Sequence, residues 1–103
     1  MQKETFLLAT GKINPENKHL LPDYSAKTSE LMMKGGGKMV SVFMVEEAIL
    51  GDNIPQTLAV LEFPDAESIK KVVNSEEYKK GISTRDKCFI ELNYCYYSAV
   101  LIF

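Results

Sequence analysis

Arg85 and Glu62 are the two charged residues whose types and positions point to chemistry. Arg85 is the single arginine among twelve basic residues. Its guanidinium could hold an acidic ligand through two parallel hydrogen bonds, or it could satisfy helix C-terminal carbonyls and pair with a carboxylate such as Glu62. Glu62 lies inside an apolar run, where an ionised carboxylate needs a partner. Ligand binding, catalysis and a structural pairing remain open for these residues.

His19 is the only histidine of the chain. On a loop before a helix it could act as a general base, ligate haem iron or lie in solvent. A lone histidine excludes a metal site built from several imidazoles, and Cys88 and Cys95 have no further ligand at metal-binding spacing. We therefore expect no metal and no dedicated cofactor. If both cysteines lie on the last strand, about 23 Å separates them, too far for a disulfide bond.

Tyrosine hydroxyl groups are most of the polar side-chain groups in otherwise apolar segments. A buried tyrosine hydroxyl normally finds a hydrogen-bond partner, so these residues suit a core or a dimer contact. They could also line a ligand cleft, with Tyr24 and Tyr78 beside Arg85. The five tyrosines are Tyr24, Tyr78, Tyr94, Tyr96 and Tyr97.

Hydrophobic patterning predicts four strands, over residues 5–13, 38–48, 57–63 and 88–97. A first helix begins near Leu20 to Pro22, since proline costs nothing in a first turn, and the glycines at 35–37 end it. Asp65 caps a second helix, and Ser75 caps a further short one. A turn-rich stretch at 51–55 joins the second and third strands into an antiparallel hairpin.

The order strand, helix, strand, strand, helix, strand predicts an α+β fold. Parallel pairing of the first strand with the strand after the first helix requires a right-handed crossover, and applying this rule twice gives a ferredoxin-like βαββαβ arrangement. The expected sheet is antiparallel and four-stranded, with the two main helices on one face.

Strict alternation makes both faces of this sheet apolar. On the last strand it places Phe89 with Cys95 on one face and Ile90 on the other, and on the second strand it separates Met39 from Val42. The helices can cover only one face. We therefore expect a second copy of the chain to cover the other face, which gives a homodimer.

Length and composition restrict the number of domains, the class of partner and the location of the protein. The chain has 103 residues, so we expect one domain over residues 1–103. Its net charge of −2 and its lysine-rich basic set argue against a nucleic-acid partner. The first apolar run is too short for a signal peptide or a membrane span, which predicts a cytoplasmic protein without a membrane partner. The apolar tail at 99–103 is expected to contact the partner copy or to cover a sheet edge.

Several short blocks together resemble one family. They are Leu61-Glu62-Phe63-Pro64-Asp65, Ser75-Glu76-Glu77-Tyr78 and Arg85, supported by Asn14-Pro15, Tyr24, Gly36-Gly37 and Gly51-Asp52. This pattern is similar to that of domain of unknown function 1330, in the dimeric α+β barrel superfamily. The resemblance implies a homodimer whose sheets close into a barrel, with a cleft between each sheet and its helices. The chain lacks the arginines that the family usually carries near Val42 and Thr57.

Three functions remain open on this basis. The first is a homodimer that binds a small organic molecule, acidic or aromatic, in the cleft between sheet and helices. The second is a cofactor-independent enzyme that uses the same cleft, since superfamily relatives include monooxygenases and isomerases. The third is a dimeric structural or interaction module without a ligand. The candidate ligand-binding residues are Arg85, Tyr78, Tyr24, Glu62 and His19.

Overall fold

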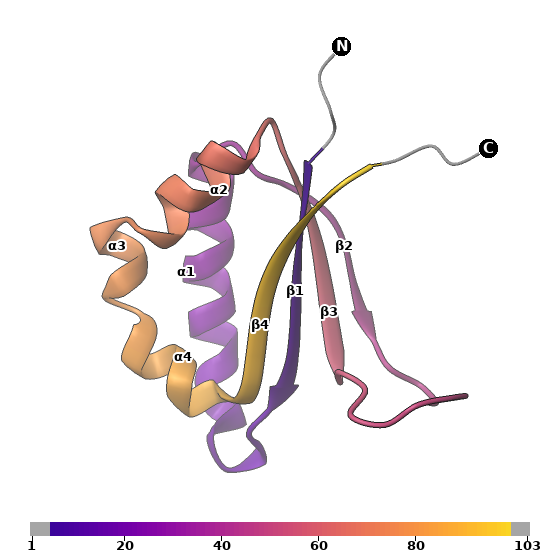
Figure 1. Cartoon of the computed structure of the whole chain (residues 1–103). Coiled ribbons are helices and arrows are strands. Elements are labelled where there is room, and N and C mark those ends of the chain that lie inside the picture. Colours follow the sequence, from indigo (N-terminus) through magenta and orange to yellow (C-terminus); the bar gives the residue numbers. More distant parts are fainter. Residues whose placement is uncertain (1–4, 100–103) are drawn as a thin grey trace, which may run out of the picture.

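The computed structural model describes residues 5–99 of the chain (Figure 1). Its elements follow the predicted order, and the second helical region consists of three short helices. In chain order the elements are β1 (Thr5–Ile13), the 3-10 helix η1 (Pro15–Leu20), α1 (Leu21–Lys34), β2 (Lys38–Met44), β3 (Thr57–Phe63), α2 (Ala66–Val73), α3 (Glu76–Lys79), α4 (Ile82–Cys88) and β4 (Phe89–Ser98).

The four strands form one sheet in the order β2-β3-β1-β4, and every neighbouring pair is antiparallel. The helices cover one face of this sheet and leave the other face open (Figure 1). This arrangement confirms the ferredoxin-like α+β prediction. The predicted parallel pairing of the first two strands is wrong, because β3 lies between β1 and β2 and pairs with both.

Local sequence signals set the two ends of α1. Pro22 lies in its first turn, where a missing N–H costs no hydrogen bond. After the helix, Gly36 has a φ of +101°, a conformation that favours glycine. A Cβ on Gly37 would lie 2.6 Å from the ring of Phe63, so the chain can pass this close to the core only without a side chain. The glycine run therefore ends a helix, as predicted.

Side-chain caps start α2 and α3. The Asp65 carboxylate accepts hydrogen bonds from the backbone N–H and the hydroxyl of Ser68, each at 2.8 Å, and these bonds lower the pKa of Asp65. Ser75 Oγ accepts a hydrogen bond from the Tyr78 N–H at 3.2 Å. The helices then bury their apolar sides against the sheet. The resulting core consists of Leu7, Met32, Leu61, Phe63, Ile69, Val72 and Tyr78.

A β-bulge in β4 changes which of its residues face the helices. The register with β1 shifts between Lys12 and Ile13, and Ile90 is the extra residue. Phe89 therefore faces the helices, with its ring edge-on to that of Tyr24 at a centroid distance of 6.1 Å. Ile90 is 68% exposed. The face that strict alternation assigned to Phe89 is wrong for this reason.

A second bulge lies in β2. Met39 pairs with Leu61 and Ser41 pairs with Val60, so Val40 is the extra residue. Met39 and Val42 consequently share the helix-covered side of the sheet. Alternation had placed them on opposite sides, which the bulge contradicts.

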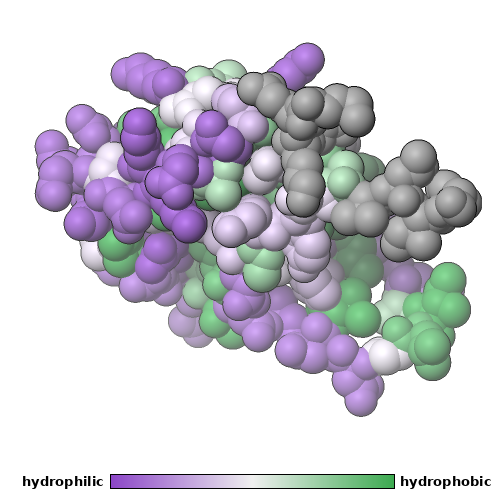
Figure 2. Space-filling view, turned by 45° about the horizontal axis from the view of Figure 1, so that its top comes forward, coloured by the Kyte–Doolittle hydropathy of each residue, from purple (hydrophilic) through white to green (hydrophobic). Residues whose placement is uncertain are grey.

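The connection between β2 and β3 is longer than predicted, because β2 ends at Met44 instead of residue 48. Residues 45–56, here named the arm, leave the sheet on its open side (Figure 1). Ile49 and Leu50 in the arm are 91% and 90% exposed. Figure 2 shows hydrophobic surface at the right-hand end of the molecule, where the arm projects.

The two cysteines lie in different environments. Cys88 ends α4 instead of starting the last strand, because the chain stays helical up to this residue, and its side chain is buried. Cys95 on β4 is exposed, and both thiols are free, as predicted. The predicted role of the apolar tail concerns residues 100–103, which lie outside the described residues. Between residues 5 and 99, no helix is long and apolar enough to cross a bilayer.

Candidate functional site

A cavity of about 280 Å³ lies between the helix-covered face of the sheet and α1. Its walls come from all four strands and from α1, and aliphatic and aromatic side chains dominate them. Val42 and Thr57 are part of the wall, so the positions where the family usually carries arginine are uncharged here. The polar atoms come from a few hydroxyl-bearing residues, including Tyr24 and Tyr94. Apolar walls with few polar groups are typical of small-molecule sites.

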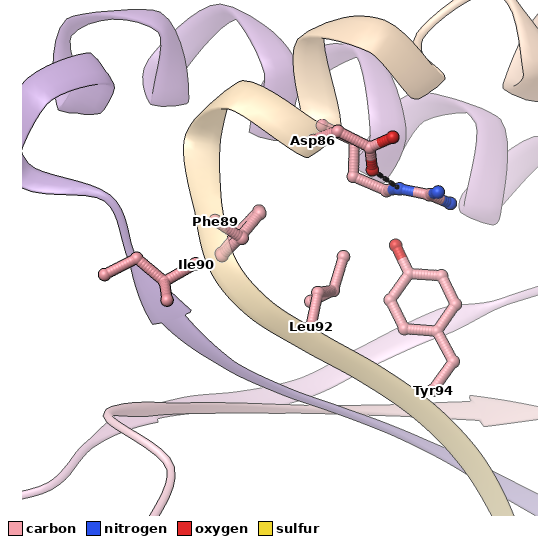
Figure 3. Close-up of a pocket in the computed structure, with 6 residues that line it drawn as sticks. Asp86, Phe89, Ile90, Leu92 and Tyr94 are labelled. Atoms are coloured by element: carbon pink, nitrogen blue, oxygen red, sulfur yellow. Dashed lines mark hydrogen bonds and ion pairs between the residues drawn. The ribbon is translucent and has the colours of Figure 1, made fainter.

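A second, more open hollow of about 460 Å³ lies on the side of α4. It shares Phe89, Leu92 and Tyr94 with the cavity, so these three side chains separate the two spaces. Figure 3 shows Leu92 and Tyr94 rising from β4 toward the helix that carries Asp86. The phenol of Tyr94 thus stands between an apolar interior and a polar opening.

Three polar side chains form a chain of hydrogen bonds at this boundary. Arg85 Nη1 donates to the Tyr78 hydroxyl oxygen at 3.3 Å. The Tyr78 hydroxyl donates to the Tyr94 hydroxyl oxygen at 2.9 Å, and the two rings are edge-on at 6.2 Å. Burial is the main cause that raises the pKa of Tyr94, and the proximity of Tyr24 adds to it. The Tyr94 phenol therefore stays protonated at neutral pH and remains a donor.

Tyr24 adds a further hydroxyl group from α1. The residue is 8% exposed, and its buried hydroxyl oxygen has no hydrogen-bond partner among residues 5–99. Burial raises the pKa of Tyr24 to about 12, with a smaller opposing effect from the neighbouring polar groups of Tyr94 and Thr28. Buried hydroxyl groups are normally satisfied, so this one requires an explanation.

Arg85 is held from two sides. Its Nε pairs with Asp86 Oδ1 at 3.2 Å, and its guanidinium carbon lies 5.9 Å from the centre of the Tyr78 ring. The hydrogen bond with Tyr78 is the main cause that raises the pKa of Arg85 further. The side chain is 28% exposed, so the positive charge lies at the boundary between solvent and the tyrosines.

Three of the five candidate residues, Tyr24, Tyr78 and Arg85, lie close together, but of these only Tyr24 lines the cavity. Glu62 does not join them. It alternates with the buried Leu61 and Phe63, so its side chain points to the open face of the sheet. The suggested pairing of Glu62 with Arg85 is therefore wrong, and the carboxylate beside Arg85 is that of Asp86.

His19 lies in η1 and is exposed. His19 lines neither the cavity nor the hollow beside α4. Within residues 5–99, no three histidine, cysteine or acidic side chains are grouped as a metal site would require.

Two residues of the site were not singled out from the sequence. Tyr94 is central to it, and the sequence pointed to it only as one of five tyrosines that could line a cleft. Phe89 reaches the cavity because of the bulge at Ile90, for which the sequence of β4 has no local signal.

Comparison with known families places the chain. Residues 5–92 match the family model described as domain of unknown function (DUF1330). The chain belongs to the DUF1330 family. No curated protein matches it in sequence.

Solved structures similar to this DUF1330 protein share its fold at low sequence identity. A protein of unknown function from Rhodopseudomonas palustris is 12% identical, with a TM-score of 0.81 over 99% of this chain and 86% of that one. A dimeric protein of unknown function with a ferredoxin-like fold, from Bacteroides fragilis, is 11% identical, with a TM-score of 0.66 over 93% and 96%. SnoaB, a cofactor-independent oxygenase from Streptomyces nogalater, is 10% identical, with a TM-score of 0.65 over 99% and 97%.

Proposed function

We propose that this DUF1330 protein is a single-domain, cytoplasmic homodimer that binds a small organic molecule in the cavity between its sheet and α1. One observation carries the proposal: apolar walls surround the buried hydroxyl group of Tyr24, for which the described part of the chain offers no hydrogen-bond partner. An unsatisfied buried hydroxyl costs about 1–3 kcal/mol of folding free energy. A bound molecule that accepts a hydrogen bond from Tyr24 would offset this cost.

The open face of the sheet supports the homodimer. Leu8 pairs with Val60 on this face, and Phe43 lies opposite Leu58. Phe43 is 52% exposed, although it belongs to a strand. A contiguous apolar surface of this kind normally marks an interface, and a second copy brings the same surface through a two-fold axis. The dimeric protein from Bacteroides fragilis has a similar fold.

The position of the arm also supports a second copy of the chain as the partner. It leaves the sheet on the open side, and Ile49 and Leu50 extend the apolar surface beyond the strands (Figures 1 and 2). Its base is fixed, because the Gln56 N–H donates to the Gly11 carbonyl and the Val45 N–H donates to the Gln56 carbonyl, each at 2.9 Å. A second sheet packed on the open face would therefore lie beside the arm.

A cofactor-independent oxygenase is the second candidate. SnoaB has a similar fold, and the chain from Arg85 through Tyr78 to Tyr94 could stabilise negative charge on a substrate oxygen. Consumption of dioxygen in the presence of a bound molecule distinguishes this enzyme from a binding protein.

Naphthalene binding, followed by the fluorescence of the probe, tests the cavity. Ala59→Leu enlarges a wall residue and is expected to weaken binding at least about tenfold. Ala26→Leu, on the exposed side of α1, is the control and should bind naphthalene as the wild type does. A wild-type protein that does not bind naphthalene, or an Ala59→Leu variant that binds it equally well, contradicts the proposed site.

Sedimentation tests the homodimer independently. We expect a dimer at micromolar concentration, with an interface above roughly 1,200 Å² in total. A stable monomer of 11.6 kDa under these conditions contradicts it.

A further inference from the structure

We infer that the cavity selects a planar, apolar molecule that presents an anionic oxygen, a phenolate or an enolate, to the hydroxyl groups of Tyr24 and Tyr94. This inference rests on the proposed binding of an organic molecule in the same cavity. It adds the chemical group by which that molecule is recognised.

The first support is the direction of the hydrogen-bond chain. A guanidinium group can only donate, so Arg85 donates to Tyr78, and Tyr78 in turn donates to Tyr94. The O–H of Tyr94 is then left to donate to another acceptor. Two hydrogen bonds thus couple the positive charge of Arg85 to the Tyr94 hydroxyl, which burial keeps protonated.

The second support is the buried hydroxyl of Tyr24. It lines the same cavity as Tyr94, and the two phenols are close enough that each contributes to the pKa of the other. Tyr24 has no hydrogen-bond partner of its own. One ligand oxygen with two acceptor sites can receive a hydrogen bond from each tyrosine, and a negative charge on this oxygen strengthens both bonds.

The third support is the character of the remaining walls. None of the described residues that line the cavity is charged. A localised anion such as a carboxylate or phosphate group would lose its hydration without an ionic partner in the cavity. A phenolate or enolate spreads its charge over a planar apolar framework, which fits walls made of residues such as Leu61, Phe89 and Leu92.

The charged groups around the tyrosines are compatible with an anion. Asp86 is the carboxylate nearest to Arg85, but its side chain is 65% exposed and faces water. On the other side of Tyr24 and Tyr78, a groove between α1 and the region of α3 carries Lys27, Lys34 and Lys80 together with Asp23, Glu30 and Glu77. These side chains are exposed, so solvent screens them, and Arg85 remains the charge coupled to the tyrosine chain.

The test uses 2-naphthol, with naphthalene as the matched probe that lacks the oxygen. The absorption spectrum of the bound naphthol distinguishes the phenol from the phenolate, whose proton is released to the solvent. The wild type should lower the pKa of bound 2-naphthol by about 1–2 units, because two hydrogen bonds to an anion favour the ionised form about 10- to 100-fold. The titration stays below the pKa of Tyr24, about 12.

Tyr24→Phe and Tyr94→Phe should each move the pKa of bound 2-naphthol back toward its value in water, while naphthalene binds as in the wild type. Tyr96→Phe, which changes an exposed tyrosine outside the cavity, is the control and should keep the wild-type shift. Tyr24→Phe removes an unsatisfied hydroxyl and is expected to fold, so it decides the test even if Tyr94→Phe does not fold.

The outcomes separate the inference from the proposed function. If naphthalene and 2-naphthol both bind and the pKa of the naphthol is unshifted, the inference is wrong and the binding site stands. A shift that persists in Tyr24→Phe also overturns the inference. If naphthalene does not bind to the wild type, the proposed function fails, and the inference fails with it.

Discussion

The two faces of the sheet have the same strands but different surroundings. On the helix-covered face, Leu7 and Phe63 are almost completely buried, and the space that remains is a cavity bordered by hydrogen-bonded tyrosines. On the open face, Phe43 and Tyr97 are about half exposed, at 52% and 54%. The first face encloses a space of small-molecule size, and the second presents a broad apolar surface.

Polar groups are distributed differently on the two faces. On the open face, charges lie toward the ends of the strands, with Lys12 and Glu91 paired at 3.5 Å at one end and Lys38 opposite Glu62 at the other. In the middle the residues are uncharged and mainly apolar, although Thr10, Ser41 and Asn93 are polar. An apolar centre with a charged rim is the usual anatomy of a protein–protein interface. On the helix-covered face the cavity is lined by uncharged hydroxyl groups, and those of Tyr24 and Tyr94 lie near each other, as expected where a single ligand group is recognised.

The largest expected effect is on association through the open face. Phe43→Asp would bury a charge in each copy at the proposed interface, and the dissociation constant of the dimer should rise at least about 100-fold. Sedimentation across a concentration series measures this change. Met33→Asp, at a similarly exposed apolar residue on α1, is the control and should leave the dimer intact. If Phe43→Asp and Met33→Asp change the dissociation constant of the dimer equally, the open face is not the interface.

An intermediate effect is expected from a change at Arg85, the charged end of the hydrogen-bond chain through Tyr78 and Tyr94. Arg85→Lys keeps the charge but loses the planar group that donates to Tyr78 and stacks on its ring. Binding of 2-naphthol phenolate should weaken roughly two- to tenfold, equivalent to about 0.5–1.5 kcal/mol, while naphthalene binding is unchanged. Lys87→Ala, an exposed change on the same helix, should affect neither probe. A lower melting temperature with normal phenolate binding would leave Arg85 a purely structural role.

The smallest expected effect is a gain in stability at the cavity. Tyr24→Phe removes the buried hydroxyl without a partner, so the free energy of unfolding at pH 7 should rise by about 1 kcal/mol in denaturant titrations. Thr28→Val, on the same helix, is the comparison variant, because it removes a neighbouring hydroxyl group and leaves the hydroxyl group of Tyr24 in place. A clear loss of stability in Tyr24→Phe would mean that its hydroxyl is satisfied in the protein.

The pH dependence of the same variant provides a second measurement. Tyr24 has a pKa of about 12 in the fold and an ordinary value of 10.0, so the unfolded chain ionises first. The stability that depends on a protonated Tyr24 is therefore complete below pH 10 and is lost as the pH rises toward 12. Tyr24→Phe lacks this contribution and should lose stability less steeply over that range. If the free energy of unfolding falls equally steeply with pH in the wild type and in Tyr24→Phe, the raised pKa does not belong to Tyr24.

Much of the fold was predictable because it follows from local physics. The bounds of β1 and β3, the proline at the start of α1 and the caps at Asp65 and Ser75 depend on residues adjacent in the chain. The order of these elements then permits few topologies, and the ferredoxin-like one is observed. The family resemblance, based on the blocks around Glu62 and Tyr78, is also confirmed.

The candidate site was only partly predictable. Tyr24, Tyr78 and Arg85 were expected to lie together in a cleft. They lie together, but only Tyr24 lines the cavity, and Glu62 was assigned a partner that lies on the other side of the sheet. Tyr94 links Tyr78 and Arg85 to the cavity, and nothing in its own sequence neighbourhood distinguishes it from Tyr96.

The sequence by itself determined the elements, their order and the apolar character of both sheet faces, because hydrophobic periodicity and capping act within a few residues. The tertiary structure alone decided which side chains share a face. The bulges at Val40 and Ile90 arise from the pairing of each strand with its neighbour, and a single extra residue exchanges the two faces for the part of the strand beyond it. For this reason Phe89 and Met39 line the cavity, although strict alternation had placed them on the opposite side from its other residues.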